Sequence, residues 1–311
     1  MIGLSLLCCV IAQAQPAARA EDRLGGEPQW VIDEVRAPGV QYRTFESAAV
    51  GGPVSYHVYL PDEYDAEPER RFPVLYWLHG GGGFSAAGVR SVSAHFRDAM
   101  RAGSIPPMIV VFPHAPAMSL WVDSKDGRLP LQTMIVAELL PHVDETLRTV
   151  ASREGRIVEG WSMGGYGAAR FGLKFPEIFG AASSLAGGPL QEEFTHTPRT
   201  SDAGRALVLR RIFGGDHEHF RALSPWRLAE ENAEAVRESL RFRVVIGDQD
   251  EMIEVAHEFH TRLEELAIPH TFTVVPGVGH EPMRVLRALG EEGGAFYRQA
   301  LAGLAEVAPE E

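Results

Sequence analysis

Ser162 stands in the stretch "GWSMG", a residue type and spacing that could supply a nucleophile. The G-x-S-x-G pattern alone is weak, because ordinary Gly and Ser frequencies produce it by chance in about one such chain in six. Its context is stronger: an apolar, strand-like run covers residues 156–161, and an Ala- and Gly-rich helical pattern covers residues 163–175. A serine nucleophile needs this sharp strand-to-helix turn, with small neighbours that accommodate a strained backbone. We therefore favour a nucleophile over the alternative, a plain helix N-cap.

A serine hydroxyl needs a base, and that base needs an orienting acid. His280 follows the last predicted strand in the Gly-rich stretch "VPGVGHEP", although a structural loop histidine is the alternative. Asp248, Asp250 and Glu251 follow the preceding strand in "VVIGDQDEM". We choose Asp250 as the acid, because Asp248 lies closest to the strand end and is placed for the turn. The order serine, acid, histidine is the chain order of α/β-hydrolases.

The stretch "HGGGGF" at residues 79–84 could help to bind a developing oxyanion. Such a hole needs two backbone N–H groups. The N–H of Met163, directly after the serine, supplies one, and Gly81 or Gly82 supplies the other, because glycine lets the backbone approach a substrate oxygen closely. A phosphate-binding loop is excluded, since no Lys-Ser/Thr pair follows the glycines.

Elements of alternating type must position these residues. Continuous apolar runs predict strands buried on both faces, and patterns of three-four spacing predict helices between them. This alternation indicates a mostly parallel sheet covered by helices on both sides, an α/β fold. Residues 54–61 alternate in character and predict an antiparallel strand. A long polar segment at about residues 188–240 interrupts the alternation, and we interpret it as an insertion at one end of the sheet. The strands are expected near residues 54–61, 74–78, 106–113, 156–161, 180–187, 242–248 and 270–277, and the helices near 131–150, 163–175, 252–266 and 284–304.

Composition limits the class of partner. The chain has 311 residues and a formal net charge of −13, which argues against nucleic acid or an anionic membrane as a main partner. Residues 1–20 contain a short apolar run and small-x-small cleavage patterns, so we predict a signal peptide and a secreted or periplasmic bacterial protein. Both cysteines, Cys8 and Cys9, lie in that segment. We expect one catalytic domain over residues 28–306, with no transmembrane segment after the signal.

The pieces "YWLHGGGG", "VVFP", "IVEGWSMGGYGAARFGLKFPEIFGAASSLAGG", "VIGDQDEM" and "VVPGVGHE" resemble an esterase family within the α/β-hydrolases. This family includes feruloyl and acetyl-xylan esterases, S-formylglutathione hydrolase, enterochelin esterase and the mycolyltransferase antigens. The resemblance spans residues of about 50–300. It implies an α/β-hydrolase fold, a serine esterase that works through an acyl-enzyme, and an acid in a strand-G-x-x-D pattern, which lands on Asp250. It implies no metal or organic cofactor.

The substrate is expected to be a small-molecule or carbohydrate-linked ester, such as a small acyl, feruloyl or acetyl-sugar ester. Trp121 and Trp226 are candidates for substrate contact, with a packing role as an equal alternative. Two other functions stay open: an acyltransferase that uses the same three residues, and a non-catalytic binding protein on a hydrolase scaffold. The oligomeric state is not predicted by the sequence.

Overall fold

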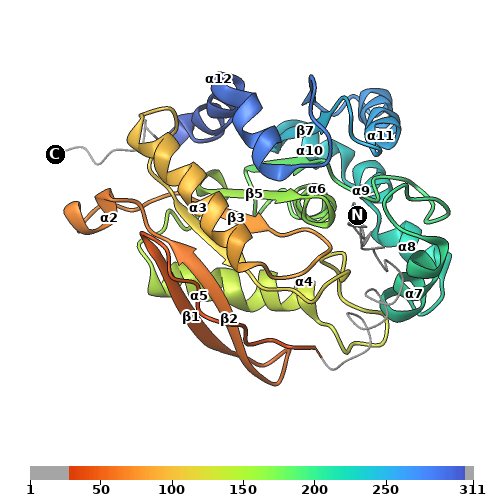
Figure 1. Ribbon diagram of the computed structural model, residues 1–311, viewed down its shortest axis with the longest axis horizontal. Helices are drawn as coiled ribbons and strands as arrows, with labels where there is room; N and C mark the ends of the chain where they lie inside the picture. Colours follow the sequence, from red (N-terminus) through yellow and green to blue (C-terminus); the bar gives the residue numbers. More distant parts are fainter. Residues whose placement is uncertain (1–27, 305–311) are drawn as a thin grey trace, which may run out of the picture.

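A central sheet organises the protein (Figure 1). The computed structural model describes residues 28–304, so the predicted signal peptide and residues 305–306 of the predicted domain lie outside the described residues. Within that part, eight strands form one sheet in the order β1-β2-β4-β3-β5-β6-β7-β8. The strands are β1 (Val40–Ser47), β2 (Gly52–Tyr59), β3 (Val74–Leu78), β4 (Ile109–Pro113), β5 (Arg156–Trp161), β6 (Ala181–Leu185), β7 (Arg241–Gly247) and β8 (His270–Val275).

The strand directions agree with the sequence patterns. β3 to β8 pair in parallel with one another, whereas β2 pairs antiparallel with both β1 and β4. Every residue of β3, β4 and β6 is buried, because helices cover both faces of the sheet at these strands. The prediction of a mostly parallel sheet, with an antiparallel strand in the first part of the chain, is therefore confirmed.

Helices cover both faces of the sheet (Figure 1). One face packs against α3 (Ala86–Arg101) and α12 (Pro282–Ala300), whose apolar residues form one core cluster with the sheet. The other face packs mainly against α6 (Met163–Lys174), α11 (Ile253–Glu265) and a continuous helical stretch at residues 131–146. That stretch contains α4 (Leu131–Thr133), a π-helical segment η1 (Met134–Leu139) and α5 (Leu140–Thr146). The short elements are α2 (Glu63–Ala66), η2 (Arg153–Gly155) and η3 (Ala302–Leu304).

The insertion contains four helices, of which α9 packs against α6, and it lies at one end of the molecule (Figure 1). They are α7 (Asp202–Phe213), α8 (His217–Leu223), α9 (Pro225–Glu231) and α10 (Ala233–Ser239). The buried Arg170 of α6 joins this unit to the sheet domain, because its Nε donates to Leu223 O at 2.6 Å and its Nη1 donates to Trp121 O at 3.0 Å. The predicted insertion is therefore a helical layer that is continuous with the main core.

Outside the insertion, and apart from the short helices α2 and η2, the elements without a prediction were β1 and α3. Most residues of β1 are exposed or partly exposed, and the strand is held by an eight-residue antiparallel register with β2. α3 begins after Ser85, whose side chain accepts a hydrogen bond from Gly88 N, and it buries Val89, Val92, Phe96 and Met100. This spacing is amphipathic, so the signal for α3 was present in the sequence.

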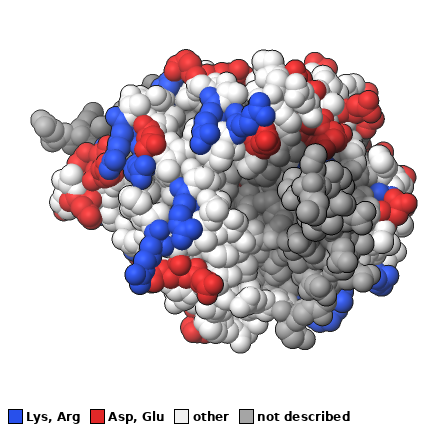
Figure 2. All heavy atoms as spheres, in the orientation of Figure 1, with Lys and Arg blue, Asp and Glu red and all other residues white. Residues whose placement is uncertain are grey.

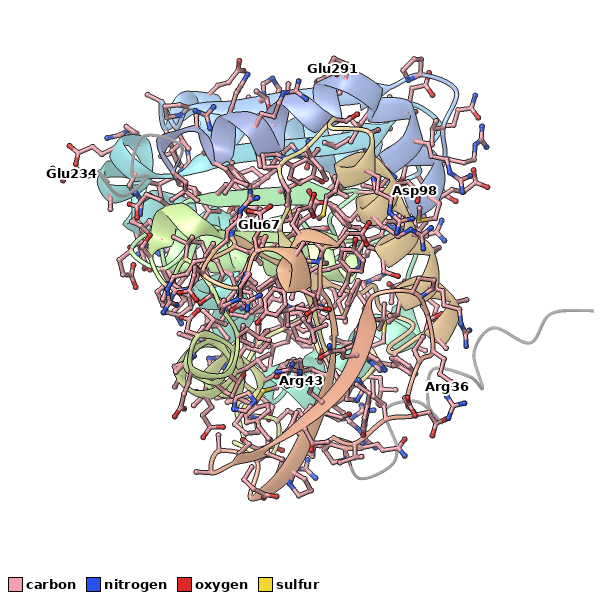
Figure 3. All side chains as sticks on the ribbon, turned by 90° about the vertical axis from the view of Figure 1, so that its left-hand side faces the viewer. Arg36, Arg43, Glu67, Asp98, Glu234 and Glu291 are labelled. Atoms are coloured by element: carbon pink, nitrogen blue, oxygen red, sulfur yellow. The ribbon has the colours of Figure 1, made fainter. Side chains whose placement is uncertain are left out.

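Charged side chains lie toward the periphery in mixed clusters on the face in Figure 2. Glu234 of α10, Glu291 of α12 and Arg36 lie at the margins of the molecule in Figure 3. In residues 28–304, no helix has the length and hydropathy that crossing a bilayer requires.

Candidate functional site

Ser162 occupies a strained turn between β5 and α6. Its φ of 57° and ψ of −116° are unusual for a residue with a side chain. The surrounding backbone holds this conformation, since Ser162 N donates to Leu185 O at 2.9 Å and Gly188 N donates to Ser162 O at 3.2 Å. β5 lies between β3 and β6, so the serine stands near the middle of the sheet at the carboxyl end of its strand.

The glycines around this turn are required by close backbone contacts. A Cβ on Gly160 would lie 2.3 Å from Gly164 O, and a Cβ on Gly164 would lie 1.9 Å from Leu78 O. A Cβ on Gly165 would lie 2.7 Å from the Cα of Gly187. Helix α6 can therefore begin this close to the sheet only with glycine at these positions.

His280 and Asp250 form a short, buried contact. His280 Nδ1 lies 2.6 Å from Asp250 Oδ2, and the side chains are 9% and 0% exposed, respectively. Asp250 Oδ1 accepts a hydrogen bond from Met252 N at 3.0 Å, so both carboxylate oxygens are engaged. A carboxylate only accepts hydrogen bonds, so Nδ1 carries the proton, and the neutral form of this imidazole has its lone pair on Nε2. The ring also packs against Trp161, with centroids 4.8 Å apart.

The loops that carry the acid and the histidine are joined by backbone hydrogen bonds. Asp248 N donates to Val275 O at 3.0 Å and Gln249 N donates to Val278 O at 3.0 Å. Asp248 uses its own carboxylate within the turn, where Oδ1 accepts from Gly277 N at 2.7 Å. Asp248 therefore shapes the turn, and it is the carboxylate of Asp250 that meets the imidazole.

His79 stabilises the glycine loop after β3. Its Nδ1 donates to Gly80 O at 2.9 Å, and its Nε2 accepts from Ala115 N at 3.2 Å. Burial lowers the pKa of His79 to about 4, so the imidazole stays neutral and keeps both a donor and an acceptor near neutral pH. One side chain thus joins the glycine loop to the segment that follows β4.

The amides of the glycine loop have a defined direction. Gly80 O accepts from Gly83 N at 3.1 Å, and Gly81 O accepts from Met118 N at 3.2 Å. The C=O and N–H of a trans peptide point in opposite directions, so the N–H groups of Gly81 and Gly82 point away from these donors. Neither N–H donates a backbone hydrogen bond to any residue in the range 28–304.

The candidate residues meet in one cavity of about 540 Å³. Its lining includes Gly81, Gly82, Ser162, Met163 and His280, with Asp250 directly behind the imidazole. The N–H of Met163 lies in the first turn of α6, where backbone donors have no partner within the helix. Across residues 28–304, no group of three or more His, Cys, Asp or Glu side chains is arranged to hold a metal ion.

The two candidate tryptophans, Trp121 and Trp226, lie outside the wall of this cavity. Trp121 is fully buried, its Nε1 donates to His79 O at 3.1 Å, and its indole packs against Gly167. Trp226 is half-buried, and its Nε1 donates to Leu190 O at 2.7 Å. Neither is among the described residues that line the cavity. Complete burial leaves Trp121 the packing role that was the alternative. Trp226 lies outside this cavity, and its indole packs against Phe259.

Sequence reasoning missed several residues of the cavity wall. Phe194, Thr197, Arg199 and Met252 line it. Phe194, Thr197 and Arg199 precede α7 in a polar stretch without periodicity, so no sequence pattern could place them at the cavity. Met118, which also lines the cavity, has a φ of 56°, an unusual conformation for a residue with a side chain. Its Sδ lies 2.9 Å from the position that a Cβ on Gly81 would take.

Comparison with known proteins identifies a family for this chain. Residues 47–279 match the family described as "Putative esterase". Esterase Rv1288 of Mycobacterium tuberculosis is 31% identical over 270 residues, which cover 78% of this chain and 56% of that protein. This chain thus spans about half the length of that curated relative.

Solved structures show the same fold. A ferulic acid esterase superposes with a TM-score of 0.68 at 23% identity, covering 83% of this chain and 97% of that one. An S-formylglutathione hydrolase from Agrobacterium tumefaciens gives a TM-score of 0.69 at 20% identity, covering 87% and 99%. The family match spans most of the chain, includes the elbow and the acid, and ends one residue before His280. The protein therefore belongs to this esterase family and has the α/β-hydrolase fold.

Proposed function

We propose that the protein hydrolyses carboxylic esters through Ser162, His280 and Asp250. The observation that carries this proposal is the buried 2.6 Å contact between His280 and Asp250, with the imidazole facing the same cavity as a serine on a strained turn. A neutral imidazole held in this tautomer is a general base, and a serine that lines the same cavity is the group that it can activate.

The reaction proceeds in two halves. Ser162 Oγ attacks the ester carbonyl carbon while its proton passes to His280 Nε2, and Asp250 stabilises the resulting imidazolium. The tetrahedral intermediate collapses, and the alcohol leaves with the proton from His280. Water then attacks the acyl-enzyme, His280 takes a proton from it, and the carboxylic acid is released as Ser162 recovers its proton.

The oxyanion of each tetrahedral intermediate is stabilised by backbone donors. The N–H of Met163 points from the first turn of α6, and the N–H of Gly81 or Gly82 is the second donor. The hydrogen bonds of His79 and Met118 to the loop carbonyls support this role, because they orient the same peptide groups. Each such donor is worth about 10²–10³ in kcat in enzymes of this type.

The substrate class proposed here is a small acyl ester or a feruloyl- or acetyl-sugar ester. The family match and the ferulic acid esterase fold support this choice. We also propose that residues 28–306 form one catalytic domain and that residues 1–20 direct secretion or export to the periplasm. N-terminal sequencing of the mature protein tests the last point, since retention of residues 1–20 would contradict it.

Replacement of the nucleophile tests the mechanism. Ser162→Ala should lower kcat for p-nitrophenyl acetate by at least about 10³-fold, because the acyl-enzyme cannot form. A fluorophosphonate probe should label the wild type on the peptide that contains Ser162 and should not label the variant. Ser91→Ala, on α3 and outside the cavity, is the matched control. Substantial esterase activity in Ser162→Ala would overturn the proposal.

A further inference from the structure

The wall of the cavity contains a cation that the proposed reaction does not use. Arg199 is the only permanently charged side chain among the described residues that line the cavity. The rest of the described wall is mainly glycine, apolar side chains and hydroxyl groups, apart from His280. Since His280 is already paired with Asp250, Arg199 is the group that a charged ligand would meet.

Arg199 stands at the mouth of the cavity. It lines the cavity, yet its side chain is 41% exposed, so it lies between the interior and solvent. It precedes α7 in the insertion and reaches across to the acid loop, where its Nη1 lies 2.8 Å from Glu251 Oε2. The contact between Arg199 and Glu251 therefore joins the insertion to the loop that carries Asp250 at the edge of the cavity.

The contact with Glu251 leaves most of the guanidinium free. Arginine has five N–H donors, and Nε and Nη2 of Arg199 have no hydrogen-bond partner among the residues that the structure describes. Glu251 is itself 57% exposed, and exposed ion pairs of this kind contribute at most about 1 kcal/mol. The guanidinium can therefore bind a second anion, or exchange Glu251 for one, at little cost.

A neighbouring hydroxyl adds a further polar group. Thr197 lines the same cavity and is 6% exposed, and its Oγ1 is buried without a hydrogen-bond partner among the described residues. A buried hydroxyl without a partner carries a desolvation penalty, which a bound acceptor would remove. Arg199 and Thr197 lie two residues apart, so one bound group could engage both.

The net charge of the whole protein affects how an anionic ligand would approach this cation. The chain carries a formal net charge of −13, which by itself disfavours the approach of an anionic ligand. A single cation with free donors at the mouth provides a local attraction against this background.

We propose that Arg199 selects esters with an anionic group, a carboxylate or similar oxyanion, placed away from the scissile bond. This inference rests on the proposed ester hydrolysis at Ser162 and names the substrate class of that same site. The anionic group binds the free guanidinium donors at the mouth, while the ester carbonyl lies at Ser162.

Pairs of esters that differ in one charge test the proposal. Mono-p-nitrophenyl adipate and p-nitrophenyl hexanoate differ in a carboxylate on the acyl part. 4-Acetoxybenzoate and its methyl ester differ in a carboxylate on the alcohol part. For each pair, the measured quantity is the ratio of kcat/KM for the charged ester to kcat/KM for the neutral ester, and the intrinsic reactivity of the esters cancels when variants are compared.

Three variants should change the ratio in defined directions. Arg199→Gln should lower it by about 10- to 100-fold in at least one pair, mainly through KM, as for the loss of a charge-assisted hydrogen bond. Arg199→Lys should restore part of the ratio. Glu251→Gln should raise it, because the competing carboxylate is gone. Arg227→Gln makes the same charge change on the insertion outside the cavity, and it should leave the ratio within about twofold of the wild type.

The outcomes separate this inference from the proposed function. An unchanged ratio in Arg199→Gln, with wild-type hydrolysis of the neutral esters intact, would overturn the anion selectivity alone. Arg199 would then only join the insertion to the acid loop through its contact with Glu251. Absence of hydrolysis of all four esters, together with absence of fluorophosphonate labelling at Ser162, would overturn both.

Discussion

Replacement of Asp250 by asparagine probes the link between the acid and the histidine. The carboxylate is fully buried, Oδ2 lies 2.6 Å from His280 Nδ1, and Oδ1 accepts from Met252 N at 3.0 Å. Asparagine has the same shape, and its amide oxygen can keep the bond from Met252 N. Its NH₂ group would then face Nδ1 and donate to it, so the imidazole proton would move to Nε2, the atom that must accept the proton of Ser162.

The expected loss is about 10³- to 10⁴-fold in kcat, or about 4–5.5 kcal/mol of transition-state stabilisation, because the wrong tautomer prevails and the imidazolium loses its counter-charge. The fold should survive, since one carboxylate–imidazole hydrogen bond is worth about 1.5–3 kcal/mol and the burial penalty of the charge disappears with it. Initial rates with p-nitrophenyl acetate measure the first effect, and guanidinium chloride unfolding measures the second.

Asp248→Asn is the matched control. Asp248 is exposed, and its Oδ1 accepts from Gly277 N at 2.7 Å, a bond that an asparagine oxygen can keep. Its kcat should stay within about threefold of the wild type, because surface substitutions that keep local hydrogen bonds have small effects. A folded Asp250→Asn variant that retains more than a tenth of the wild-type kcat would refute the assignment of Asp250. An equal loss in Asp248→Asn would do the same.

Two further predictions concern stability. Gly164→Ala should lower the free energy of unfolding by about 1–3 kcal/mol and reduce Tm, because its Cβ would lie 1.9 Å from the carbonyl oxygen of Leu78. Gly52→Ala is the control and should leave Tm nearly unchanged, because nothing lies within 4 Å of its Cβ. Equal Tm values for the two variants would contradict the close-packed turn. Burial lowers the pKa of His79 from 6.5 to about 4. Between these two pH values the unfolded chain binds a proton that the native protein does not. The free energy of unfolding therefore keeps the full contribution of neutral His79 above pH 6.5 and falls by about 3 kcal/mol as the pH drops to 4. Unfolding curves from pH 7 to pH 4 should show a shallower loss in His79→Gln, and an identical slope would refute this origin.

Much of the architecture follows from local sequence patterns. Continuous apolar runs such as that of β3 can be satisfied only by burial on both faces, which requires a parallel sheet between helices. The stretch "GWSMG" predicted a tight turn at Ser162, and the structure has it, because glycine is the only residue that fits where α6 meets the sheet. The family membership also follows from the sequence, since its motifs extend over most of the chain.

Tertiary structure decided what the sequence left open. Three acids follow β7 in four residues, and only the fold shows that Asp248 shapes its turn, Glu251 meets Arg199 and Asp250 meets His280. Trp121 is of a residue type that can contact a substrate, yet packing against α6 buries its side chain completely. The sequence by itself determined which residue types stand at the ends of the strands. Which of those side chains face one cavity depends on contacts between segments far apart in the chain, and no local pattern encodes such contacts.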